Sequence, residues 1–127
     1  PYLICPVLDA RKQEVYFCHY RFKNGKLEKE SQEQVASPAE AVRGIRESCI
    51  FVGNGAKLYR RQISSVLGDW AHFAAESQHT IRASALAWLS LPRFKRKETD
   101  DVHWLVPHYI RKSDAELKNK TGNTSKS

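Results

Sequence analysis

The sequence predicts an α/β domain built on one mixed sheet, in which antiparallel strands come first and strand–helix units follow. Two apolar runs near the start, residues 3–9 and 15–22, flank a polar link at residues 11–14, which is the pattern of a β-hairpin. After residue 36, short apolar runs alternate with stretches whose apolar residues have helical spacing. Such alternation is typical of parallel strands joined by helices, so the sheet is expected to contain both kinds of pairing.

The first strand is nearly all apolar, which predicts a place inside the sheet and not at its edge. A chain that begins in the middle of a core and contains no Met is expected to be the carboxy-terminal half of a longer protein. Asn24-Gly25 predicts a two-residue turn, because both central positions of that turn take positive φ. The third strand, about residues 26–35, carries several charges, so we expect it at an edge.

Helix-end signals predict the next elements. Ser37 is expected to cap a helix that has Pro38 in its first turn and Glu40 completing a capping box. A buried parallel strand is predicted at residues 49–53, after which Asn54-Gly55 turns the chain into a second helix at residues 56–67. The buried stripe of the first helix is predicted at Val42, Ile45 and Cys49.

Gly68 is expected to end the second helix, and a short strand is predicted near residues 71–75. A third helix is predicted at residues 82–94, bending or ending near Leu91 because Pro92 follows. Its inward face is predicted at Ala85, Leu86, Trp88 and Leu89. Finally, residues 104–106 are expected to form a helical turn, and residues 107–111 a last short strand or an extended segment.

This order of elements, three antiparallel strands and then helix, strand, helix, strand and helix, is the ribonuclease H-like arrangement. We therefore predict one ribonuclease H-like domain at residues 1–112. Residues 113–127 are polar and rich in Lys, Asn, Ser and Thr, so they are expected to form a disordered tail.

Composition limits the class of protein. The 127 residues suffice for one domain, and no run of about 18 apolar residues could span a membrane. Cys5, Cys18 and Cys49 lie in apolar contexts, which predicts buried thiols in a reduced, cytoplasmic protein and neither disulfides nor a zinc site.

The chain carries 21 Lys and Arg against 14 Asp and Glu, a net charge of +7. Four of these cations, Arg93, Lys95, Arg96 and Lys97, form a cluster that suits the phosphate backbone of a nucleic acid. An equally supported interpretation of this cluster is that it is the solvated end of a helix.

Asp9 ends the first strand, where ribonuclease H-like nucleases carry a carboxylate that binds a divalent metal. A two-metal site needs several oxygen ligands, and Glu14 on the neighbouring strand is the only candidate for a second one. The fourth strand ends without a carboxylate, and no acid lies between Arg82 and Lys97. A polar residue that starts a turn is therefore the favoured interpretation of Asp9.

Gly53-Asn54-Gly55 joins a strand to a helix, a place where backbone amides can hold phosphate. The segment matches neither G-x-G-x-x-G nor a P-loop, so a structural turn is favoured. The histidines also lack the spacing of a zinc peptidase.

Four segments, residues 7–16, 51–56, 82–87 and 106–111, resemble the carboxy-terminal domain of the bacterial TsaB (YeaZ) family. The resemblance extends over roughly residues 3–115. Its most specific pieces are the LDAR…EVY hairpin and the segment P-x-Y-[LI]-R near the end.

The resemblance implies one half of an actin-like ATPase fold, which consists of two ribonuclease H-like domains. It further implies a non-catalytic subunit in the threonylcarbamoyladenosine modification of transfer RNA, without a metal or cofactor of its own. Such a subunit acts through the full-length protein with the paralogue TsaD and the small ATPase TsaE, and meets transfer RNA indirectly. The family's amino-terminal half is absent here, so full binding to TsaD is not expected, and a homodimer is left open.

The alternative function is a metal-dependent hydrolase of the same fold. It would be a nuclease that uses Asp9 and Glu14, or a peptidase of the M22 (glycoprotease) type, which is an older label of the family.

Overall fold

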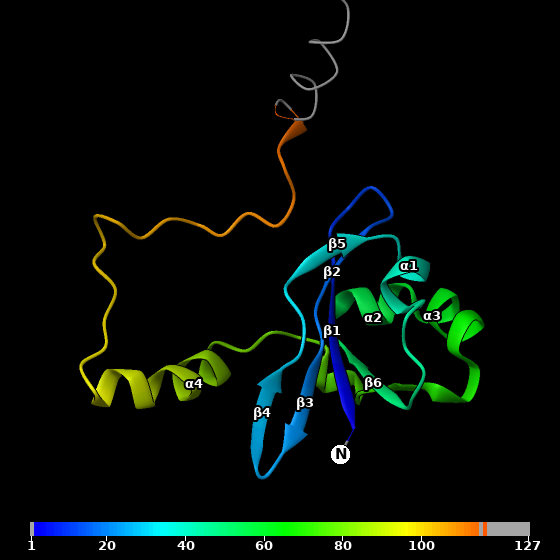
Figure 1. The fold of residues 1–127 in the computed structure, drawn as a ribbon, viewed down its shortest axis with the longest axis horizontal. Coiled ribbons are helices and arrows are strands. Elements are labelled where there is room, and N and C mark those ends of the chain that lie inside the picture. Colours follow the sequence, from blue (N-terminus) through cyan, green and yellow to red (C-terminus); the bar gives the residue numbers. More distant parts are fainter. Residues whose placement is uncertain (1, 115, 117–127) are drawn as a thin grey trace, which may run out of the picture.

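The computed structural model describes residues 2–114 and 116. Its central strand is β1 (Leu3–Asp9), which is antiparallel to β2 (Val15–Phe17) and β3 (Tyr20–Lys23) on one side and parallel to β6 (Cys49–Val52) on the other (Figure 1). Neighbours on both sides explain the apolar composition of β1, because such a strand has no edge exposed to water. The predicted interior position is confirmed.

The predicted second strand is present in two pieces that keep one register. Val7 pairs with Phe17 in β2, and Leu3 pairs with Arg21 in β3, so the break at residues 18–19 interrupts the ladder without shifting it. The third strand is also divided, into β4 (Lys26–Lys29) and β5 (Gln34–Ala36).

Between β4 and β5 the third strand has two more residues than the strand it pairs with, so the chain bulges there. Two hydrogen bonds of the His19 backbone stabilise the bulge: the His19 N–H donates to the Ser31 hydroxyl at 2.8 Å, and the His19 carbonyl accepts from Glu30 N at 2.7 Å. At the opposite edge of the sheet, β7 (Ala71–Phe73) runs parallel to β6. Across the sheet, the order is the third strand, the second, β1, β6 and β7, which is the predicted ribonuclease H-like topology.

Local end signals act as predicted. Asn24 and Gly25 both have positive φ, 51° and 74°, as a tight hairpin turn requires. α1 (Pro38–Val42) is capped by Ser37, whose hydroxyl accepts from Glu40 N at 3.3 Å. This helix is shorter than predicted and ends before Gly44, yet Ile45 and Cys49 beyond it are still buried.

The predicted second helix is divided at Tyr59 into α2 (Asn54–Leu58) and α3 (Arg60–Leu67). Gly68, with φ of 56°, ends α3 and opens the short 3-10 turn η1 (Gly68–Trp70). A second 3-10 turn, η2 (Glu76–Gln78), follows β7.

One hydrophobic core lies between the sheet and helices α1, α2 and α3, which gather on one side of it in Figure 1. The side chains of Val7, Val15 and Phe51 are almost fully buried there. All three cysteines are buried and free, as predicted. A hydrogen bond to Cys49 and burial both raise the pKa of the Cys5 thiol, so this thiol stays protonated.

α4 (Ala83–Lys95) forms where the third helix was predicted, but the prediction that its apolar face is buried is wrong. Leu86, Trp88 and Leu89 are 65%, 75% and 77% exposed, and Ala85 is exposed as well. The helical spacing of apolar residues predicts a face that needs a cover, but no other element among residues 2–114 and 116 packs closely on it.

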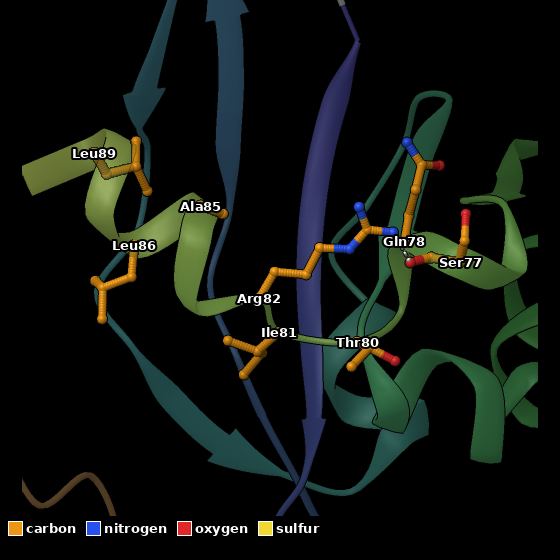
Figure 2. A pocket seen from close by; sticks show the side chains of 8 residues that line it. All are labelled: Ser77, Gln78, Thr80, Ile81, Arg82, Ala85, Leu86 and Leu89. Atoms are coloured by element: carbon orange, nitrogen blue, oxygen red, sulfur yellow. Dashed lines mark hydrogen bonds between the residues drawn. The ribbon is translucent and has the colours of Figure 1, made fainter.

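α4 lies on the side of the sheet opposite to α1, α2 and α3 (Figure 1). Leu86, Leu89 and Ile81 line a groove of about 620 Å³ between α4 and η2 (Figure 2). The helix does not end near Leu91 but continues through Pro92 to Lys95. Pro92 lacks one N–H donor and stands in the last turn, so only three residues of the helix follow it.

Beyond α4 the chain has little regular structure. The helical turn predicted at residues 104–106 lies earlier, at residues 102–104, and Trp104 N and Leu105 N both donate to the Asp101 carbonyl at 3.0 Å. The last short strand predicted at residues 107–111 is not present: residues 107–109 have no regular structure, residues 110–111 form a bend, and none of them pairs with a strand among the described residues. Most of the tail predicted to be disordered, residues 115 and 117–127, lies outside the described residues.

Candidate functional site

A pocket of about 570 Å³ opens at the carboxyl end of β1, next to the end of the parallel strand β6. Its polar lining comes from three separate segments and comprises Asp9, Asn54, His79 and Thr80; its apolar lining is Leu8, Tyr16 and Ile81. In open sheets with parallel strands, ligands bind at this end of the strands. The pocket is therefore the candidate functional site of the domain.

Asp9 lies in this pocket and starts the turn after β1. Its Oδ1 accepts a hydrogen bond from Arg11 N at 3.0 Å, which is an Asx turn, and the Arg11 guanidinium is 3.9 Å from Oδ2. The Asp9 N–H donates to Asn54 Oδ1 at 3.0 Å. The structure thus joins two segments that the sequence analysis singled out separately, Asp9 and the segment 53–55.

The two glycines of segment 53–55 pack directly on β1. A Cβ at Gly53 would lie 2.4 Å from the Val7 carbonyl oxygen, and one at Gly55 would lie 2.8 Å from the carbonyl carbon of Leu8. Gly53 also has a φ of 114°, which L side chains rarely adopt. These contacts explain both glycines by backbone packing, in line with the interpretation of the segment as a structural turn.

His79 is a pocket residue that the sequence analysis did not single out. It is 8% exposed, and its Nδ1 accepts a hydrogen bond from Gly53 N at 3.1 Å. Since Nδ1 is an acceptor here, the ring proton resides on Nε2. No local pattern marks this residue, because its partner is 26 positions away along the chain.

Glu14, the other candidate metal ligand, lies in a different pocket from Asp9, together with Lys12, Arg111 and Asp114. Its carboxylate forms an ion pair with the Arg111 guanidinium. Each of the two candidate carboxylates therefore faces an arginine of its own. Among residues 2–114 and 116, no group of three or more His, Cys, Asp and Glu side chains is arranged to hold a metal ion.

The basic cluster lies at the carboxyl end of α4, where cations interact favourably with the helix dipole. Two of its members have acidic neighbours: Arg93 is 3.6 Å from Asp100, and Arg96 Nε is 2.6 Å from Glu98. The hydrogen bond from Arg96 holds the pKa of Glu98 below its usual range. All four cations of the cluster are exposed.

Solved structures share this fold. A crystal structure of an uncharacterised protein with similarity to the peptidase YeaZ, from Pseudomonas aeruginosa, matches 86% of this chain and 49% of its own length, with a TM-score of 0.65 at 21% identity. YeaZ from Pseudomonas aeruginosa matches with a TM-score of 0.62 at 21% identity, over 84% of this chain and 49% of its own. The family model described as TsaD, tRNA N6-adenosine threonylcarbamoyltransferase, matches residues 1–119. Fold and profile together define a ribonuclease H-like domain of the TsaD, or glycoprotease, class.

A relative of known name shows to which family within this class the chain belongs. The tRNA threonylcarbamoyladenosine biosynthesis protein TsaB of Bacillus subtilis (strain 168) is 38% identical over 119 residues, which are 91% of this chain and 50% of that protein. The chain belongs to the TsaB (YeaZ) family, as the resemblance predicted. It spans about half the length of these relatives. No helix among the described residues has the length and apolar character needed to cross a membrane.

Proposed function

We propose that this domain serves, within a full-length TsaB-like protein, as a non-catalytic subunit in the threonylcarbamoyladenosine modification of transfer RNA. The other subunits are a TsaD-like paralogue and a TsaE-like ATPase, and the complex works in the cytoplasm. The name of the Bacillus subtilis relative and the matching family model support the pathway. The non-catalytic role rests on one observation: Asp9 and Glu14 do not converge, since each is engaged by its own arginine.

The test is reconstitution of the full-length protein with a TsaD-like and a TsaE-like protein, with mass spectrometry of the modified adenosine in transfer RNA. The Asp9→Asn variant is expected to keep the full modification rate, because the asparagine oxygen can still accept from Arg11 N and only the charge is lost. The exposed Asp69→Asn, away from both the pocket and the basic cluster, is the matched control for the loss of one carboxylate.

A carboxylate that takes part in proton transfer contributes about 10²–10⁴-fold to a rate. A loss of that size in Asp9→Asn, with normal co-purification of the subunits, would show that Asp9 takes part in the chemistry. It would replace the subunit proposal by an enzymatic one. With a threonylcarbamoyl donor supplied in every reaction, modification at the same rate with and without the TsaB-like protein would contradict the pathway itself.

We also propose that the basic cluster, Arg93, Lys95, Arg96 and Lys97, contributes to holding transfer RNA in that complex. Reversing all four charges to Glu is expected to weaken transfer RNA binding by at least tenfold and to flatten its salt dependence, because each lost phosphate contact lowers the slope by about 0.9 or less. The measurement is the dissociation constant of the complex over a series of salt concentrations.

The matched control reverses four exposed cations elsewhere, Lys26, Arg43, Lys57 and Arg61. Both variants change the net charge equally, so general repulsion affects them alike. If transfer RNA binding were weakened equally in the cluster variant and the control variant, or not at all in the cluster variant, the proposed contact at the end of α4 would be contradicted.

A further inference from the structure

The link between β1 and β2 has an unusual backbone. Arg11, Lys12 and Gln13 have φ values of 62°, 52° and 58°, so three consecutive residues other than glycine are in the left-handed region. Two hydrogen bonds within the link, Ala10 N to the Glu14 carbonyl and Glu14 N to the Arg11 carbonyl, are both 2.9 Å long. Left-handed conformations of this kind persist only where the surroundings hold them.

The surroundings are supplied by the chain about 100 residues further on. Arg111 Nη1 donates to the Ala10 carbonyl at 2.7 Å, and Nη2 donates to the Glu14 carboxylate and, at 3.5 Å, to the Arg11 carbonyl. The guanidinium carbon is also 5.7 Å from the centre of the Tyr16 ring. One guanidinium thus contacts both ends of the link and lies over the ring of Tyr16 in β2, the strand that follows the link.

A second contact comes from the same segment. Lys12 Nζ, at the middle of the link, donates to both carboxylate oxygens of Asp114 at 2.7 and 2.9 Å. The hydrogen bond from the Lys12 ammonium holds the pKa of Asp114 below its usual range. Arg111 is the better buried anchor, because its side chain is 20% exposed whereas those of Lys12 and Asp114 are 58% and 66% exposed.

The link leads directly to the candidate pocket. Its first amide, Arg11 N, is the donor to the Asp9 carboxylate, and the Asp9 N–H is in turn bound by the Asn54 side chain. The Arg11 N–H and the Ala10 carbonyl belong to one planar peptide unit, so the hydrogen bond from Arg111 to that carbonyl and the hydrogen bond from Arg11 N to Asp9 hold the same plane from its two sides. Through Arg111, the segment that ends at this residue contacts the hairpin, and these are the two most specific pieces of the family resemblance.

We propose that Arg111 is a positioning residue for the pocket at the end of β1. Its guanidinium spans the Ala10 and Arg11 carbonyls and the Glu14 carboxylate and holds the link in its left-handed form. By holding the Ala10 carbonyl it also fixes the peptide plane whose N–H, that of Arg11, orients the Asp9 carboxylate. The proposal concerns the domain itself and does not depend on the role in transfer RNA modification.

The test is nuclear magnetic resonance of the 127-residue chain with Arg111→Ala, Arg111→Lys and the neighbouring Lys112→Ala as control. In Arg111→Ala, amide hydrogen exchange at Ala10 and Glu14 is expected to be at least tenfold faster. The Arg11 amide and the Asn54 side-chain resonances are expected to shift. Amides in the core of the sheet, such as that of Phe51, keep their protection.

Arg111→Lys keeps the charge beside Glu14 but lacks the planar fork. It is therefore expected to restore only part of the protection, and it gives an answer even where Arg111→Ala does not fold. Unchanged exchange at Ala10 and Glu14 would overturn the proposal. So would full restoration by lysine, an equal effect of Lys112→Ala, or a uniform loss of protection that includes the core, since each points to charge or general stability instead of positioning.

Discussion

Replacing Gly53 by alanine is expected to destabilise the domain by about 2–6 kcal/mol. The new Cβ would lie 2.4 Å from the Val7 carbonyl oxygen, a backbone atom that cannot move without disturbing β1. Such overpacking costs about 1–3 kcal/mol. The φ of 114° adds strain of about 1–3 kcal/mol for a residue with a side chain.

The free energy of unfolding in urea measures this effect, and Gly44→Ala is the matched control. A Cβ at Gly44 meets no atom within 4 Å and its φ is not in the left-handed region, so that variant is expected to be neutral or stabilised by about 0.4–1 kcal/mol. Equal effects of the two substitutions would contradict the packing of segment 53–55 on β1. Gly55→Ala, with contacts of 2.8–2.9 Å to backbone atoms, is expected to behave like Gly53→Ala.

The features that the sequence predicted well are those with local physical causes. The Asn24-Gly25 turn, the Ser37 cap and the end of α3 at Gly68 each depend on the conformational preference of one or two residues. β1 was placed inside the sheet because a strand flanked on both sides has an apolar composition that needs no knowledge of its partners.

The features that the sequence could not predict depend on contacts between distant segments. The bond from Gly53 N to His79 and the anchoring of the hairpin link by Arg111 join residues 26 and about 100 positions apart. The divided third strand depends on the backbone N–H and carbonyl of His19 in its neighbour, which bind Ser31 and Glu30. The break at Tyr59 has no proline or glycine at its position.

α4 shows a different limit. The spacing of its apolar residues predicted a helix correctly, but it did not predict where the apolar face of that helix would lie. Periodicity indicates that one face of a helix is apolar, and it does not indicate which surface packs on that face. For the site, the sequence indicated Asp9 and the segment 53–55, whereas their direct contact through Asn54 became visible only in the fold.

Phe51→Ala is expected to reduce the free energy of unfolding by about 3–5 kcal/mol, whereas Phe94→Ala on α4 is expected to change it by less than about 0.5 kcal/mol. The two substitutions remove the same atoms from very different surroundings: Phe51 is fully buried in β6, and Phe94 is 72% exposed. Phe51 also loses its tilted contact with the Phe73 ring, whose centre is 5.7 Å away.

A small domain is stable by only about 5–15 kcal/mol, so Phe51→Ala removes a large share of the total. Urea unfolding followed by tryptophan fluorescence and by circular dichroism measures both variants. A cost of 2 kcal/mol or more for Phe94→Ala would mean that α4 packs against apolar surface in solution, which contradicts its exposed position. A cost near zero for Phe51→Ala would contradict the core between the sheet and helices α1, α2 and α3, because a cavity the size of a phenyl ring cannot form there without loss of packing.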